Sequence, residues 1–244
     1  MQYTRLIAGA ALMVLGANAA QAQGRGRGRG NDQGEHRGED QGRGHVVSSA
    51  EQQRRIAEEQ QRQADYQRRL TAQINAANAR NAQLQAQRRS NAQLAAQQRY
   101  IQQLQAEQAR TRSVHNYTTD PYVSAPPTYR YIYSGQARTT NQYGVDQLRG
   151  AINNGYNFGY QQGQADRQDG ASSNYRRSLA YADANYGYNG YVGLGDYNYY
   201  FRQGFQRGYS DGYGSRLQYG SLNNGNASIL SNIISGILGL TSIR

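Results

Sequence analysis

The chain has 244 residues, no cysteine, and 27 basic against 16 acidic residues, which gives a formal net charge of +11 at pH 7. The absence of cysteine excludes disulfide bonds, thiol chemistry and cysteine-ligated metal sites. Every basic residue is arginine, and 19 of the 22 tyrosines follow residue 113, so the two halves of the chain differ in chemistry.

Residues 1–22 have the pattern of a secretory signal peptide. Arg5 precedes an apolar run from Leu6 to Ala17, and small residues follow in A-N-A and A-Q-A patterns. The run is too short for a transmembrane span. We expect cleavage after Ala22 or Ala19, and no cysteine follows that could carry a bacterial lipid anchor. The sequence therefore predicts an exported bacterial protein of the periplasm, cell envelope or extracellular medium.

Residues 23–47 are predicted to be a disordered, R-G-rich spacer. The stretch from 23 to 45 contains no apolar side chain, so it cannot form a core. R-G repeats also occur in RNA-binding segments. Five arginines against four carboxylates give this stretch a net charge of only +1, which favours a solvated spacer.

Residues 48–113 are predicted to form one long helix, a stalk. Ser48 and Ser49 precede Glu51 and Gln52 at capping-box spacing, and no glycine or proline occurs between 50 and 112. An unbroken helix of this length would span about 95 Å. Its larger apolar residues form a loose stripe, which fits either an isolated helix or a weak coiled coil. We expect self-association through residues 48–113.

The stalk carries much of the net charge, because it has 11 arginines against five carboxylates. Outside the cytosol, the anionic partners within reach are envelope polysaccharide, lipid head groups and released nucleic acid. A merely solvated helix surface is the alternative interpretation. The candidate polymer-binding residues are Arg68, Arg69, Arg80, Arg88, Arg89 and Arg99.

Residues 114–140 are predicted to be a linker, because they hold all three prolines, Pro121, Pro126 and Pro127. Within this stretch, Y-R-Y-I-Y at 129–133 alternates as a short strand would.

Residues 141–220 contain one pattern written twice, at an offset of 49 residues (155 to 204). Glycines recur every fourth residue, which places them on one face of a helix. Each interior glycine costs about 0.8–1 kcal/mol relative to alanine, so close approach of two helix backbones is the expected compensation. We predict a helical hairpin packed through these faces; a flexible Gly/Tyr-rich region is the alternative. The packing residues are Gly155, Gly159, Gly163, Gly204, Gly208 and Gly212.

Between the two copies, residues 173–185 are predicted to form a short helix and residues 186–196 a loop. Asp196 is expected to cap the second glycine helix. Gly170 and Gly220 are expected to end the two glycine helices.

Residues 221–244 are predicted to form an amphipathic helix, too short to span a bilayer. Docking on the glycine helices and peripheral contact with a membrane both fit this pattern. The residues for a membrane contact are Ile229, Ile233, Ile234, Ile237 and Leu238.

Catalytic chemistry is not indicated. His36, His45 and His115 all lie in the predicted spacer or linker, so no serine has a histidine partner and no zinc pattern exists. Ala165 and Arg167 occupy positions where a calcium loop near Asp166 would need oxygen ligands. We predict no catalytic, cofactor-binding or metal-binding residue, no cofactor and no small-molecule substrate.

The paired G-Y/F-x-x-G-Y-x-x-G blocks, with D-R-x-x-G after the first and F-x-x-G-Y-x-D-G-Y-G in the second, resemble those of uncharacterised exported bacterial proteins. Their spacing is also similar to that of glycine-zipper envelope proteins, although the faces beside the glycines are polar here. The resemblance covers residues 143–220 and implies a location but no activity. Together, these patterns predict a non-enzymatic exported envelope protein with a structural or interaction role. The alternative is a protein that binds nucleic acid or acidic polysaccharide through the stalk arginines.

Overall fold

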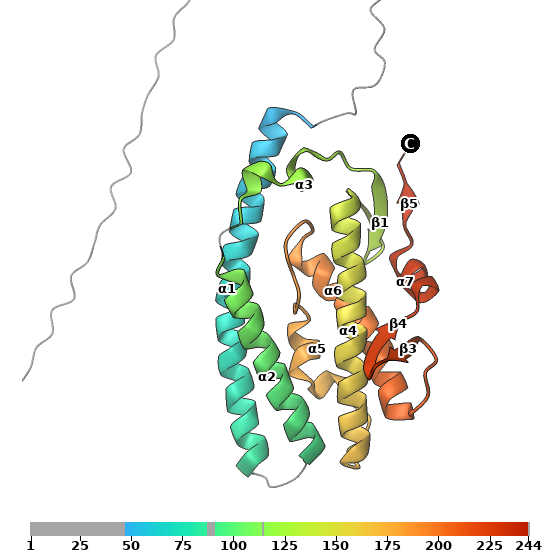
Figure 1. The fold of residues 1–244 in the computed structure, drawn as a ribbon. Coiled ribbons are helices and arrows are strands. Elements are labelled where there is room, and N and C mark those ends of the chain that lie inside the picture. The colour runs from blue at the N-terminus through green and yellow to red at the C-terminus, as the bar shows by residue number, and fades with distance from the viewer. Residues whose placement is uncertain (1–46, 87–90, 114, 244) are drawn as a thin grey trace, which may run out of the picture. The chain divides into compact units, whose positions relative to one another are not determined.

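The computed structural model describes residues 47–86, 91–113 and 115–243, and these residues are mainly helical, as predicted. Residues 1–46 lie outside the described part, and with them the predicted signal peptide and all of the predicted spacer except Val47. The described residues belong to one compact unit. Figure 1 shows long helices together with short strands, and the strands form one three-stranded and one two-stranded sheet.

The predicted stalk is a pair of antiparallel helices rather than one long helix. Helix α1 spans Ser49–Ala86 and helix α2 spans Asn91–Thr111. The Gln67 side chain donates to the Thr111 carbonyl and the Gln97 side chain to the Ala77 carbonyl, so the two helices run in opposite directions. Figure 1 shows them side by side. We call this pair the α1–α2 hairpin.

The apolar stripe of the stalk faces the interior of the protein. Its buried residues are Tyr66, Leu70, Ala77, Leu84, Tyr100, Ile101 and Leu104. Removing this apolar surface from water within one chain is favourable, and folding back allows both helices to contribute to a single core. Self-association through residues 48–113 stays a prediction. The apolar residues expected to support it are buried in the core of the same chain.

The predicted linker is largely ordered structure. Asp120 caps the short helix α3 (Pro121–Ser124), with Pro121 in its first turn, where a missing N–H costs nothing. Strand β1 (Tyr129–Tyr133), which confirms the predicted strand, pairs antiparallel with β2 (Gln136–Thr140). The two-residue turn Ser134-Gly135 has positive φ at both positions, as tight hairpins require. Pro121 therefore starts a helix, and Pro126 and Pro127 lie in the short connection between α3 and β1.

The two glycine helices are α4 (Gln142–Gln168) and α6 (Leu194–Gly214). Gly155 faces Phe201, and Gly163 faces Tyr209, so the residue numbers increase in the same direction along both helices. The helices are therefore parallel, and the predicted helical hairpin was wrong on this point. Residues 169–193 return the chain through the 3-10 turn η2 (Tyr175–Arg177) and helix α5 (Leu179–Asp183), which lies within the predicted short helix.

Two predicted helix boundaries were wrong. Gly193, not Asp196, is the N-cap of α6, and Asp196 lies in the first turn with its carboxylate directed to other partners. Helix α6 ends at Gly214, with Ser215 in the left-handed region, and Gly220 belongs to the next strand. The stop predicted at Gly170 is confirmed: α4 ends at Gln168, and Gly170 has a φ of 62°.

The predicted amphipathic helix near the C-terminal end is present, but it is shorter than residues 221–244. Strands β3 (Gly220–Asn223) and β4 (Asn226–Ile229) form a hairpin, and only α7 (Ser231–Leu238) is helical. Strand β5 (Thr241–Ser242) then pairs with β1, giving the sheet order β2-β1-β5. Helix α7 contacts α4 and α6, so it docks on the glycine helices.

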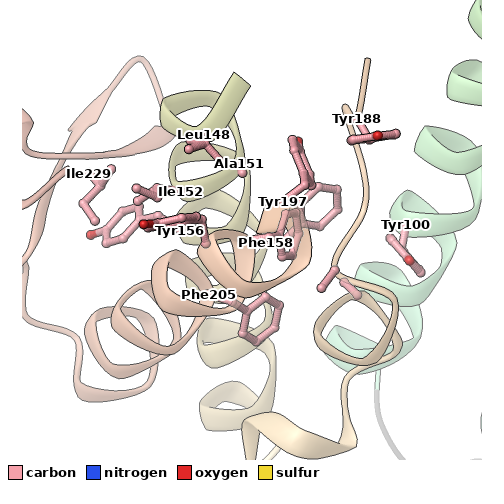
Figure 2. Close-up of a cluster of buried hydrophobic side chains, with 14 of the residues drawn as sticks. Tyr100, Leu148, Ala151, Ile152, Tyr156, Phe158, Tyr188, Tyr197, Phe205 and Ile229 are labelled. Atoms are coloured by element: carbon pink, nitrogen blue, oxygen red, sulfur yellow. The ribbon is translucent and has the colours of Figure 1, made fainter. Parts of the chain in front are cut away.

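Aromatic and aliphatic side chains fill both sides of the glycine-helix pair. Figure 2 shows Tyr156 and Ile229 on the side of the C-terminal hairpin. Phe158 lies on the opposite side, toward Tyr100 of α2, with ring centroids 5.7 Å apart at nearly a right angle. The core is thus continuous between the α1–α2 hairpin and the C-terminal half.

Candidate functional site

The six glycines proposed from the sequence for helix packing all lie where α4 and α6 meet. An added Cβ at any of them would overlap backbone atoms of the facing helix. On α4, Gly155, Gly159 and Gly163 face the carbonyl groups of Phe201, Phe205 and Tyr209. On α6, Gly204, Gly208 and Gly212 face those of Ile152, Tyr156 and Tyr160. This contact is structural, since it leaves no room for a ligand.

Buried tyrosines around this contact bind carboxylates. The Tyr156 hydroxyl donates to Asp211 (2.7 Å), and the Tyr209 hydroxyl donates to Asp166 (2.7 Å), so each glycine helix supplies one donor and one acceptor. Burial, followed by the hydrogen bond to the carboxylate, raises the pKa of both phenols. These phenols therefore stay protonated donors, which suits a structural role and not a nucleophilic one.

The same pairing connects the α1–α2 hairpin to the C-terminal half. The Tyr66 hydroxyl lies 3.0 Å from the Glu107 carboxylate and 2.9 Å from the Asn185 carbonyl. Glu59 accepts the Tyr191 N–H at 3.1 Å and pairs with Arg62. Burial raises the pKa of Glu59, and the charge of Arg62 opposes that shift. Two of the hairpin's five carboxylates, 1 % and 4 % exposed, are therefore directed inward.

This inward placement changes the charge of the hairpin surface. Among its described residues, the most exposed charged residues are all arginines, whereas Glu51, Glu58 and Asp65 are partly exposed and each pairs with an arginine. We call these exposed arginines the arginine surface: Arg54, Arg68, Arg69, Arg99, Arg110 and Arg112. Arg54, Arg68 and Arg110 pair with carboxylates of their own helix. The other three have no ion pair with any described residue.

The six arginines proposed from the sequence are not all in one place. Arg68, Arg69 and Arg99 belong to the arginine surface. Arg80 is half-buried and lines a separate small pocket. Arg88 and Arg89 lie outside the described residues.

A larger cavity of about 370 Å³ lies between α1, the β1–β2 hairpin and the start of α6. Its wall is strongly polar. The Asp196 carboxylate accepts hydrogen bonds from Tyr131 and Arg138, both at 2.5 Å. The other charged residues of the wall, all on α1, also pair with one another: Glu51, Arg54, Arg55, Glu58 and Arg62. Because every charge in this wall has a partner, the cavity gives no sign of a charged ligand.

Sequence reasoning missed the Tyr131–Asp196–Arg138 cluster because 65 residues separate the tyrosine from the aspartate. A weaker signal exists on α1, where carboxylates recur every seventh residue at 51, 58 and 65, each followed by arginines three or four positions later. That spacing places ion pairs along one flank of a helix.

The residues proposed for membrane contact lie against the protein core. Ile229 and Leu238 are buried, and Ile233, Ile234 and Ile237 pack against the core while half-buried. None of the helices in the described part of the chain is long and apolar enough to cross a membrane. Peripheral membrane contact stays a prediction.

Within the described residues, no group of three or more histidine or carboxylate side chains could hold a metal ion. His115 is bonded to the Asp120 carboxylate at 2.7 Å, and Asp120 also accepts from the Tyr191 hydroxyl. This histidine therefore helps to order residues 115–124 beside the loop at Tyr191. His36 and His45 lie outside the described residues.

No protein-family model matches this chain, and no curated protein or solved structure matches it either.

Proposed function

We propose that this chain is an exported, non-enzymatic envelope protein that binds an acidic polysaccharide through the arginine surface. The observation that carries the proposal is the separation of charge on the α1–α2 hairpin. Glu59 and Glu107 are turned into the core, while Arg69, Arg99 and Arg112 are exposed without a carboxylate partner among the described residues. Guanidinium groups with free donors bind carboxylate, sulfate and phosphate groups through paired hydrogen bonds.

An acidic polysaccharide is favoured over single-stranded nucleic acid by the placement of the aromatic side chains. Proteins that bind single strands combine basic grooves with exposed aromatic platforms on which bases stack. Among the described tyrosines and phenylalanines, Tyr143 is the most exposed, at 38 %, and it lies on α4 rather than on the hairpin. The export signal predicted at residues 1–22 also supports a partner outside the cytosol.

The test measures affinity for a uronic-acid polysaccharide at several salt concentrations, with double-stranded DNA as a second ligand. The variant carries R69Q, R99Q and R112Q together. We expect log affinity to fall linearly with log salt in the native chain, and the slope to lose about 2–3 in magnitude in the variant.

A matched control removes the same charge elsewhere, with R130Q, R167Q and R216Q, since these exposed arginines also lack an ion pair with any described residue. We expect the control to retain the native affinity and slope within about twofold. Equal losses in both triple variants would show that only net charge matters and would contradict the proposed surface. Binding of DNA but not of the polysaccharide would overturn the choice of partner.

A further inference from the structure

A small polar pocket lies apart from the arginine surface, where α1, α2 and α4 meet the segment from 171 to 179. Its volume is about 70 Å³, which is room for a few water molecules or one small anion. Arg80 of α1 and Arg177 of η2 both line it, with Ser172 and Gln97 beside them. Two arginines from distant parts of the chain thus line one pocket.

Neither arginine forms an ion pair with a described residue. In the larger cavity beside α1, by contrast, the arginines are paired with carboxylates, for example Arg62 with Glu58 and Arg138 with Asp196. For Arg80 and Arg177 there is no ion pair or side-chain hydrogen bond to a described residue. Each guanidinium offers five N–H donors and no acceptor, and two like charges at one pocket repel each other. An anion between them would satisfy the donors and remove the repulsion.

The pocket also contains one carboxylate, that of Asp166, which is 5 % exposed. Its Oδ1 accepts from the side-chain amides of Gln93 (3.0 Å) and Gln162 (2.8 Å), and its Oδ2 accepts from the Tyr209 hydroxyl (2.7 Å). These three donors hold Asp166 in the core of the protein, and it forms no salt bridge with either arginine. Its negative charge weakens an anion site without filling it.

We infer that this pocket binds one acidic oxygen group (carboxylate, sulfate or phosphate) between Arg80 and Arg177. This inference rests on the proposed function, because an acidic polymer that covers the hairpin supplies such groups along its length. A free inorganic oxyanion offers the same chemistry, and the experiment separates the two sources.

The first arm uses inorganic phosphate alone with the mature chain and its R80Q and R177Q variants. We expect phosphate to raise the melting temperature of the native chain, and its affinity to fall about tenfold in each variant. The control R167Q removes an exposed arginine of α4 that does not line the pocket, and we expect it to behave as the native chain does. Circular dichroism establishes that all three variants are folded.

A further variant, D166N, removes the opposing charge while keeping an oxygen that can accept from Tyr209. We expect it to bind phosphate more tightly than the native chain does. Phosphate affinities that are equal in the native chain, R80Q and R177Q would overturn the site. A loss of phosphate affinity in R167Q as large as that in R80Q and R177Q would also overturn it.

The second arm repeats the polysaccharide measurement with R80Q and R177Q. Weaker polymer binding with an otherwise steep salt dependence supports a polymer-borne group in the pocket. Polymer binding that is unchanged, together with phosphate binding lost in R80Q and R177Q, assigns the pocket to a free oxyanion and overturns the link to the polymer. Absence of any polymer binding, with phosphate still bound through Arg80 and Arg177, overturns the proposed function and leaves the pocket standing.

Discussion

At the scale of single residues, the tyrosines of this protein act as hydrogen-bond donors inside the core. Tyr66, Tyr156 and Tyr197 are fully buried, yet each hydroxyl has a partner. A buried hydroxyl without a partner would cost about 1–3 kcal/mol. Carboxylates that the sequence would place in solvent serve as acceptors, which explains why an acidic residue can lie in the core.

Tyr156→Phe should destabilise the protein by about 1–2 kcal/mol. The Asp211 carboxylate would lose its hydroxyl donor and retain only the backbone N–H groups of Gln218 and Tyr219, at 3.0 and 2.9 Å. Urea unfolding measures the change. Tyr143→Phe is the control, because Tyr143 is 38 % exposed and its hydroxyl forms no hydrogen bond to a described residue. A loss of stability as large in the control as in Tyr156→Phe would contradict this role for the hydroxyl.

Residue spacing alone could locate the packing glycines but not the carboxylate partners. The glycines recur every fourth position, a local period that a helix turns into one face. Tyr156 and Asp211 are 55 residues apart, and nothing in the local sequence pairs them. The burial of Glu59 and Glu107 could not be predicted from the local sequence either, because both lie in polar helix segments. They are buried through contacts with residues 185–191, which are distant in the sequence.

At the scale of elements, the parallel contact of α4 and α6 depends on the absence of side chains at the crossing. Gly159→Ala should cost about 3 kcal/mol or more, because its Cβ would overlap the backbone of Phe205 and neither helix can move away without opening the core. Thermal and urea unfolding of the variant test this expectation.

The matched control is Gly150→Ala on the same helix, where an added Cβ meets nothing within 4 Å. The better helix propensity of alanine should stabilise the protein by about 0.5–1 kcal/mol there. Opposite signs for the two substitutions are the expected outcome. If both stabilise, then the helices do not approach as closely as described.

Composition and residue spacing could predict which segments are helical, whereas the residues at which the helices begin and end often could not be predicted. The break between α1 and α2 has no glycine or proline signal. Instead, the Asp169 carboxylate at the end of α4 accepts the backbone N–H groups of Ala92 and Gln93, at 3.2 and 2.7 Å. This cap from another helix adds to the local signal of Ser90 and Asn91, which are residue types common at helix starts. The parallel direction of α4 and α6 was likewise missed, because glycine spacing is the same in both directions.

At the scale of the whole molecule, the buried tyrosines predict a sharp loss of stability in alkali. Burial raises the pKa of Tyr200 to about 12, and burial together with a carboxylate partner raises the pKa of Tyr131 and Tyr156 further. In the unfolded chain these phenols ionise at about pH 10. Their contribution to stability is therefore complete below pH 10 and is lost as the pH rises through the folded-state pKa values.

Urea unfolding between pH 8 and 12 measures this dependence, with tyrosinate absorbance recorded in parallel. We expect the urea midpoint to fall steeply above about pH 10, and most tyrosines to ionise only as the chain unfolds. Arginine stays charged over this range, so it does not contribute to the loss. Gradual ionisation of all tyrosines near pH 10, with the fold intact, would contradict the buried network.

The inward contacts of the α1–α2 hairpin also determine when this part of the protein can fold. Tyr66 is bound 119 residues later at Asn185, and Glu59 is bound 132 residues later at Tyr191. Contacts between such distant positions form slowly and require most of the chain. The hairpin is synthesised long before its partners, so we expect its amides to gain hydrogen-exchange protection only once residues 185–191 are available. The helices that are made first therefore complete these contacts only after more than 100 further residues have been added.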